Sequence, residues 1–213
     1  MKRLLPILFL LIVGCFPDSA EEVVNSLTSP KEMEMEEDLK RVRVKLSQED
    51  SSFQQFYSRF VMSLLIGNRQ EMHKFVSPEN GVYMIESPGA LPLISKTYQL
   101  AEFKLQNDSS VWMTNIDVHI MMEDLVFETL PKVICDEEIY DKQGCFAQEI
   151  NPLLESQIWN YAGLNEKQIQ AIEFLVKTVE ITVVNTSNFI FYFSKIEGKW
   201  FLTFLDVRTP CAA

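Results

Sequence analysis

Residues 53–66 read FQQFYSRFVMSLLI, a stretch whose apolar side chains recur every three and four residues. This spacing places them on one face of an α-helix. Residues 47–52 offer several N-terminal capping side chains, and Gly67-Asn68 supplies a C-terminal stop. We therefore expect an amphipathic helix over 53–66, with an inward face formed by Phe53, Phe56, Tyr57, Phe60, Val61, Leu64 and Leu65.

Helical and strand patterns follow this helix along the chain. A second short helix is expected before Ser77-Pro78, and a strand is expected after the Asn80-Gly81 turn. Alternating polar and apolar residues over 111–120 predict a half-buried strand, which Leu125 to Thr129 would extend into a sheet. Asn151-Pro152 and the Asn165–Gln168 capping box start two more helices. The expected helices are 69–76, 152–162 and 166–176, and the expected strands are 82–85, 111–120 and 125–129.

The last forty residues are rich in β-branched and aromatic side chains. Strands over 178–185, 189–195 and 200–207, with a hairpin turn at Glu197-Gly198, predict a three-strand antiparallel meander. The fold class is therefore α+β, with N-terminal helices packed on a curved antiparallel sheet. Six aromatic residues of the meander either pack in the core, which we favour, or line an apolar ligand pocket: Phe189, Phe191, Phe193, Trp200, Phe201 and Phe204.

The N-terminus carries a targeting pattern. Lys2 and Arg3 precede an apolar run over 4–13, which is too short for the ~20 residues of a membrane-spanning helix. The ending Leu11-Ile12-Val13-Gly14-Cys15 resembles the lipobox of bacterial lipoproteins. This resemblance implies a signal peptide over 1–14, lipidation of Cys15 with palmitate among the acyl chains, and a place in the cell envelope, at the outer membrane. We expect an acidic tether over 15–46 and a single α+β domain over 47–213.

The net charge of −11 limits the classes of partner. A strongly acidic surface is repelled by the phosphates of nucleic acids and by anionic lipid headgroups. We therefore expect no nucleic-acid partner. We expect the membrane to be reached through the acyl chains of a lipid anchor.

Three cysteines remain once Cys15 is assigned to lipid: Cys135, Cys145 and Cys211. An exported chain meets oxidising conditions, so we expect one disulfide and one free thiol. We favour Cys135–Cys145, which would close a short polar loop. The alternative, in which one of these two pairs with Cys211 and fastens the C-terminus, stays open. The spacing contains no C-x-x-C metal motif.

Three segments carry a family resemblance. They are residues 53–66, residues 77–89 (SPENGVYMIESPG) and the tail from Trp200 to Ala213. Together they are similar to uncharacterised Gram-negative lipoproteins of the nuclear-transport-factor-2-like family. The resemblance implies a cone-like curved sheet wrapped around helices. It leaves function open, because this fold serves both enzymes and binding modules.

The sequence contains one candidate catalytic pair, Asp117 and His119. If the strand over 111–120 lined a cavity, Asp117 could orient His119 as a general base of a lyase, isomerase or hydrolase. Ordinary outward-facing polar residues explain the same pattern, and we favour that interpretation. The chain has no nucleophile elbow, phosphate loop, dinucleotide fingerprint or H-E-x-x-H motif. We expect no cofactor and no metal, and a non-catalytic envelope lipoprotein that binds an envelope protein or a small apolar ligand.

Overall fold

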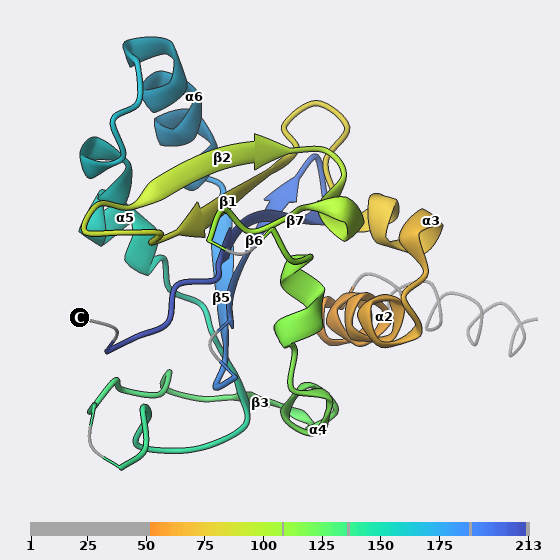
Figure 1. The fold of residues 1–213 in the computed structure, drawn as a ribbon. Helices are drawn as coiled ribbons and strands as arrows, with labels where there is room; N and C mark the ends of the chain where they lie inside the picture. The colour runs from red at the N-terminus through yellow and green to blue at the C-terminus, as the bar shows by residue number, and fades with distance from the viewer. Residues whose placement is uncertain (1–51, 108, 136, 188, 212–213) are drawn as a thin grey trace, which may run out of the picture. The chain divides into compact units, whose positions relative to one another are not determined.

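The computed structural model describes residues 52–107, 109–135, 137–187 and 189–211. Within them the chain is mixed α+β and contains a seven-stranded sheet in the order β2-β1-β7-β6-β5-β4-β3 (Figure 1). The predicted signal peptide, Cys15 and the tether over 15–46 lie outside the described residues. The strands are β1 (Val82–Glu86), β2 (Leu93–Thr97), β3 (Leu125–Phe127), β4 (Cys145–Gln148), β5 (Val179–Asn185), β6 (Phe189–Ile196) and β7 (Lys199–Asp206).

The sequence predicts an antiparallel sheet, but the observed sheet contains both parallel and antiparallel strand pairs. The C-terminal meander β5–β6–β7 is antiparallel as predicted, but β1 runs parallel to β7 and β3 runs parallel to β4. Strands β1 and β7 are far apart in the sequence, so no hairpin fixes their relative direction. The connection from β3 to β4 spans residues 128–144, which is long enough for the crossover that parallel neighbours require.

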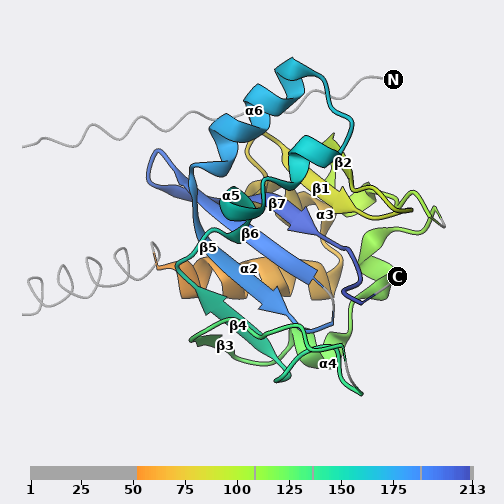
Figure 2. The ribbon, with the colours of Figure 1, turned by 90° about the vertical axis from the view of Figure 1, so that its left-hand side faces the viewer.

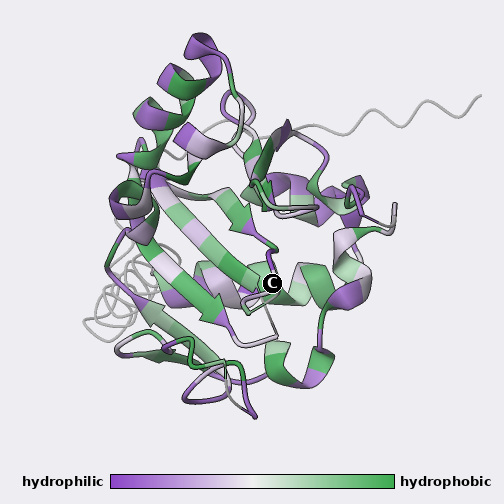
Figure 3. Cartoon of the chain, turned by 60° about the vertical axis from the view of Figure 1, so that its left-hand side comes forward, coloured by the Kyte–Doolittle hydropathy of each residue, from purple (hydrophilic) through white to green (hydrophobic). Residues whose placement is uncertain are grey.

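Helices cover both faces of the sheet (Figure 2). One core packs α2, α3 and α4 against β1, β5, β6 and β7, and a second core packs α5 and α6 against the opposite face. Hydrophobic residues accordingly run along the central strands (Figure 3). The helices are α2 (Phe53–Ile66), α3 (Arg69–Met72), α4 (Val118–Met121), α5 (Pro152–Ser156) and α6 (Glu166–Val176), with 3-10 turns η1 (His73–Phe75), η2 (Leu100–Glu102), η3 (Trp112–Asn115) and η4 (Ile158–Tyr161).

Helix α2 confirms the opening prediction. The Ser52 hydroxyl accepts a hydrogen bond from the Gln55 backbone N–H at 3.3 Å, and Gly67 ends the helix at φ +67°. Phe60 is fully buried, with its ring centroid 5.4 Å from that of Phe191 and 5.6 Å from that of Phe193. The alternate phenylalanines of β6 therefore form core packing, the interpretation favoured from the sequence.

The predicted strand over 111–120 is wrong. These residues form η3 and α4 instead, because two interactions favour turns over extension. The buried Trp112 indole donates a hydrogen bond to the Leu100 carbonyl at 2.8 Å. The Asp117 carboxylate caps α4 by accepting from the backbone N–H groups of His119 and Ile120 at 2.9 and 3.3 Å.

The three other predicted helices form with small changes. The helix expected over 152–162 divides into α5 and η4 at Gln157, which has φ +47°. The helix over 166–176 forms with its capping box, in which the side chains and backbone N–H groups of Asn165 and Gln168 bond reciprocally. The short helix after Gly67 becomes α3 followed by η1.

Replacing Phe60 by alanine should lower the free energy of unfolding by about 3–5 kcal/mol, because a fully buried ring leaves a cavity. The matched variant Phe174→Ala removes a ring that is 74% exposed on α6, and it should change stability by less than about 0.5 kcal/mol. Urea denaturation of the two variants measures the difference. Equal losses would contradict the packing of α2 described above.

Candidate functional site

The cysteine pairing differs from the favoured prediction. Cys135 is bonded to Cys211, with 5.6 Å between their Cα atoms, and Cys145 is a buried free thiol. The pairing Cys135–Cys145 is therefore wrong, and the alternative that fastens the C-terminus is correct. The reason is that Cys145 opens β4, where its side chain faces inward and contacts Asn185 of the neighbouring strand.

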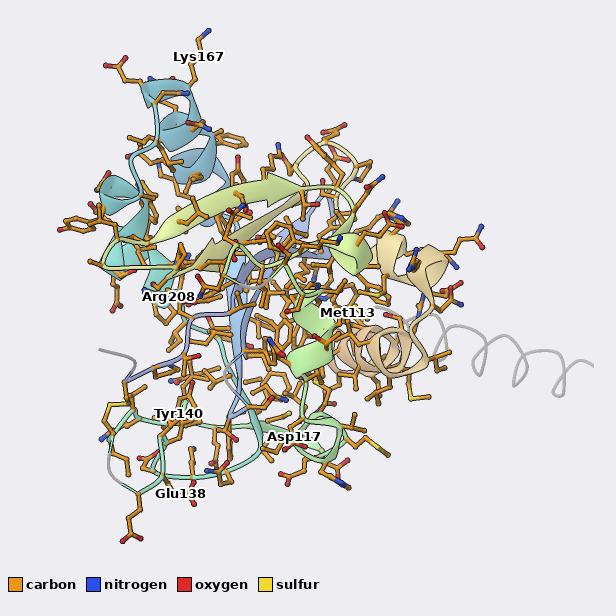
Figure 4. All side chains as sticks on the ribbon, in the orientation of Figure 1. Met113, Asp117, Glu138, Tyr140, Lys167 and Arg208 are labelled. Atoms are coloured by element: carbon orange, nitrogen blue, oxygen red, sulfur yellow. A yellow bond between two sulfur atoms is a disulfide. The ribbon has the colours of Figure 1, made fainter. Side chains whose placement is uncertain are left out.

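The Asp117–His119 pair does not have the arrangement expected for general-base catalysis. Both residues lie at α4 rather than on a strand, and both are exposed. Figure 4 shows Asp117 near the edge of the described fold. Its carboxylate caps the helix backbone, and no hydrogen bond to the His119 imidazole is present within the described ranges. The observation on which the enzyme alternative depended is therefore missing.

Two pockets lie beside α2, and Gln54 lines both. The methionine pocket, of about 410 Å³, lies between α2 and the segment from α4 to β3. Three methionine side chains form much of its wall, and two of them, Met62 and Met122, are 53% and 67% exposed. Its lining is Gln54, Tyr57, Ser58, Val61, Met62, Leu65, Met121, Met122, Glu123, Asp124 and Leu125.

A sulfur-containing polar cluster lies beneath the methionine pocket. The Asn185 amide donates to the Cys145 Sγ at 3.0 Å and to the Met121 Sδ at 3.4 Å, and the Cys145 thiol donates to the Ile120 carbonyl at 3.1 Å. The Tyr57 hydroxyl is buried without a hydrogen-bond partner in the described part of the chain. These contacts join the pocket floor to β4 and β5.

Burial controls the ionisation of this cluster. It raises the pKa of Tyr57, and the nearby Cys145 adds to that effect. It also raises the pKa of the Cys145 thiol, although the nearby Tyr57 hydroxyl and the hydrogen bond from the Asn185 amide act in the opposite direction. A nucleophilic cysteine requires a lowered pKa, so Cys145 has the character of an inert core thiol.

Two buried carboxylates were not singled out from the sequence. Glu86 is 5% exposed, and burial raises its pKa, although its Oε2 accepts a hydrogen bond from the Gln106 backbone N–H at 2.8 Å. Its Oε1 has no partner within the described segments. Such an acid is a candidate proton donor, but Glu86 lines neither of the two pockets. A signal for it existed in the sequence, since an acid directly follows the apolar run 82–85.

Asp206, the second buried carboxylate, has a structural role. The Arg208 guanidinium donates to both of its oxygens, from Nε at 2.9 and 3.1 Å and from Nη2 at 2.6 Å. Burial, with a contribution from Asp206, raises the pKa of Tyr140 to about 12. Arg208 and Tyr140 are labelled in Figure 4. These residues stabilise the C-terminal segment that the Cys135–Cys211 disulfide also holds.

Comparison with known proteins gives no assignment, because no family model, curated protein or solved structure matches this chain. Among residues 52–211, apart from the three internal gaps, no helix is long and apolar enough to cross a membrane. The same residues contain no cluster of three or more His, Cys, Asp or Glu side chains suited to hold a metal ion.

Non-reducing proteolysis should yield a linked peptide pair containing Cys135 and Cys211, detectable by mass spectrometry. Cys145 should be alkylated only after unfolding, because its thiol is buried. Cys211→Ser should lower the free energy of unfolding by about 2–4 kcal/mol, since the disulfide closes a long loop. The control Cys145→Ser should keep the linked pair. Recovery of a Cys135–Cys145 link would refute this pairing.

Proposed function

We propose that this chain is a non-catalytic binding domain that holds a small apolar ligand in the methionine pocket. The observation that carries the proposal is the pocket itself, about 410 Å³ with methionine, leucine and valine walls. Its volume lies within the range of small-molecule sites, which are mostly apolar with a few polar groups. Tyr57, Gln54 and Ser58 supply neutral polar groups here, and Glu123 and Asp124 add two carboxylates.

Methionine suits this role because its side chain is flexible and polarisable. Met62 and Met122 lie on opposite sides of the pocket, on α2 and next to β3, and can adjust to ligands of different shape. Cys145 is a buried thiol with a raised pKa, and the Asp117 carboxylate caps α4, so neither of them supplies an activated nucleophile or base to the pocket. Binding without chemistry is the function that this set of groups supports.

The proposed location is the cell envelope. Lys2, Arg3 and the apolar run ending in Gly14-Cys15 support export, cleavage before Cys15 and lipidation of that cysteine. The tether over 15–46 would then separate the domain from the membrane. We also propose the cone-like variant of the α+β fold, for which the packing of α2 on one sheet face and the parallel β1–β7 pair are the supporting features.

A neutral apolar fluorophore such as N-phenylnaphthylamine should bind the full chain with a rise in fluorescence. The double variant Met62→Gln with Met122→Gln should weaken this binding about five- to tenfold, because polar amides replace apolar contact area of similar size. Ser58→Phe, which places a ring at the pocket wall, should abolish it.

The matched control is Leu91→Gln. Leu91 is 67% exposed, as is Met122, but it lies outside the methionine pocket. The control should bind the fluorophore like the parent chain. Unchanged binding by the methionine and Ser58 variants, or no binding by the parent chain, would refute the proposed site.

Cys15→Ser should prevent lipidation while leaving the folded domain unaffected, because the acylated atom is the thiol sulfur. Incorporation of labelled palmitate in growing cells measures the effect, with Cys145→Ser as the control that keeps its label. Equal labelling of the Cys15→Ser variant and the parent chain would rule out the anchor.

A further inference from the structure

The second pocket beside α2 has a different character. This aromatic pocket, of about 660 Å³, is defined by Ser52, Phe53, Gln54, Phe127, Glu149, Glu180, Ile181, Lys195 and Trp200. Three of these residues carry aromatic rings that come from α2, β3 and β7. The ring of Phe53 lies 5.0 Å from that of Trp200 and 6.0 Å from that of Phe127, with interplanar angles of 68° and 89°. The rings pack against one another edge to face. Phe53 is only 7% exposed, so the ring surface open to a ligand comes mainly from Phe127, which is 43% exposed, and from the half-buried Trp200.

The pocket combines these rings with uncompensated negative charge. Glu149 and Glu180 both line it, and neither forms an ion pair within the described residues. Lys195 is the one cationic side chain in the lining. Its charge balances only one of the two carboxylates, so the walls keep an excess negative charge.

Lys195 also shows where a cation is favoured. Its Nζ lies 5.3 Å from the centroid of the Trp200 ring, within the range of a cation–π interaction. An ammonium group of this chain therefore already lies against an aromatic wall of the pocket. A mobile lysine side chain can leave this position when a ligand cation takes it.

We propose that the aromatic pocket binds a quaternary ammonium group. Aromatic faces attract such a group through their ring quadrupoles, and its methyl groups need no hydrogen-bond acceptors. The carboxylates of Glu149 and Glu180 supply long-range attraction for the same charge. A primary ammonium can also take this position, as Lys195 shows, but it loses hydrogen bonds to water against the aromatic rings, a cost that a quaternary ammonium does not have.

This site is independent of the proposed function. The two pockets share only Gln54. Methionine, leucine and valine side chains dominate one lining, whereas three aromatic residues line the other, and each lining also contains two carboxylates. Substitutions at Glu149, Glu180 or Trp200 should leave binding of the neutral fluorophore in the methionine pocket unchanged. Failure of one site therefore does not imply failure of the other.

Calorimetric titration of the full chain with choline tests the site. The neutral carbon isostere of choline, in which a tert-butyl group replaces the trimethylammonium group, has the same shape without the charge. Choline should bind at least about fivefold more tightly than this isostere, because only choline gains the cation–π and carboxylate interactions. Equal binding of both compounds, or binding of neither, would overturn the proposal.

Substitutions of its lining residues test whether choline binds in the aromatic pocket. Glu149→Gln and Glu180→Gln should each weaken choline binding about two- to fivefold, and Trp200→Leu should weaken it to a similar extent. Lys195→Met should strengthen it, because a competing cation is removed. Glu173→Gln, which changes an exposed acid on α6 and gives the same net charge, is the matched control and should bind like the parent chain. Weakening by the control as large as that by Glu149→Gln and Glu180→Gln would overturn the assignment.

Phosphocholine distinguishes two sources of the ammonium group. A free quaternary amine should bind more tightly than phosphocholine, whose phosphate would be repelled by the two carboxylates. Tighter binding of phosphocholine would support the ammonium site and would identify a lipid headgroup as its source. Weaker binding of both compounds by the Trp200→Leu variant is the expected result for either source.

Discussion

The packing of the α2 aromatic face against the alternate phenylalanines of β6 is the interaction on which the rest of this structure depends. Phe60, Phe191 and Phe193 are fully buried, and the Phe60 ring meets each of the other two edge to face, an arrangement that aromatic quadrupoles favour. This contact fixes the helix over the meander and sets which side of each strand is the core. Both pockets follow from it, because α2 is held at a fixed distance from the peripheral strand β3.

Some polar groups inside the domain stabilise the fold, and others remain available to contact a ligand. Asn185 stabilises the fold, because its amide donates hydrogen bonds to the sulfur atoms of Cys145 and Met121 beneath the methionine pocket. Asp206 and Arg208 also serve structure, because they stabilise the chain that leads to the disulfide. The groups left for a ligand are the flexible methionines on one side of Gln54 and the aromatic rings with two carboxylates on the other.

Two of the sequence predictions failed because a distant contact outweighed a local pattern. The alternation over 111–120 is genuine, yet Trp112 reaches the Leu100 carbonyl and Asp117 caps a helical turn. The short spacing of Cys135 and Cys145 favoured their pairing, yet the start of β4 at Cys145 turns that side chain into the core. The partners Leu100 and Cys211 lie outside the windows in which these patterns were seen, whereas the Asp117 cap forms within one of them.

The sequence by itself determined the α2 helix, the α6 capping box and the three-strand meander, because each depends on periodicity and end signals within a few neighbouring residues. Only the tertiary structure decided the parallel pairs, the Cys135–Cys211 disulfide and the two pockets. Phe53, Phe127 and Trp200 come from three distant parts of the chain. Their meeting depends on how the elements pack, and the spacing of residues within any one element carries no information about it.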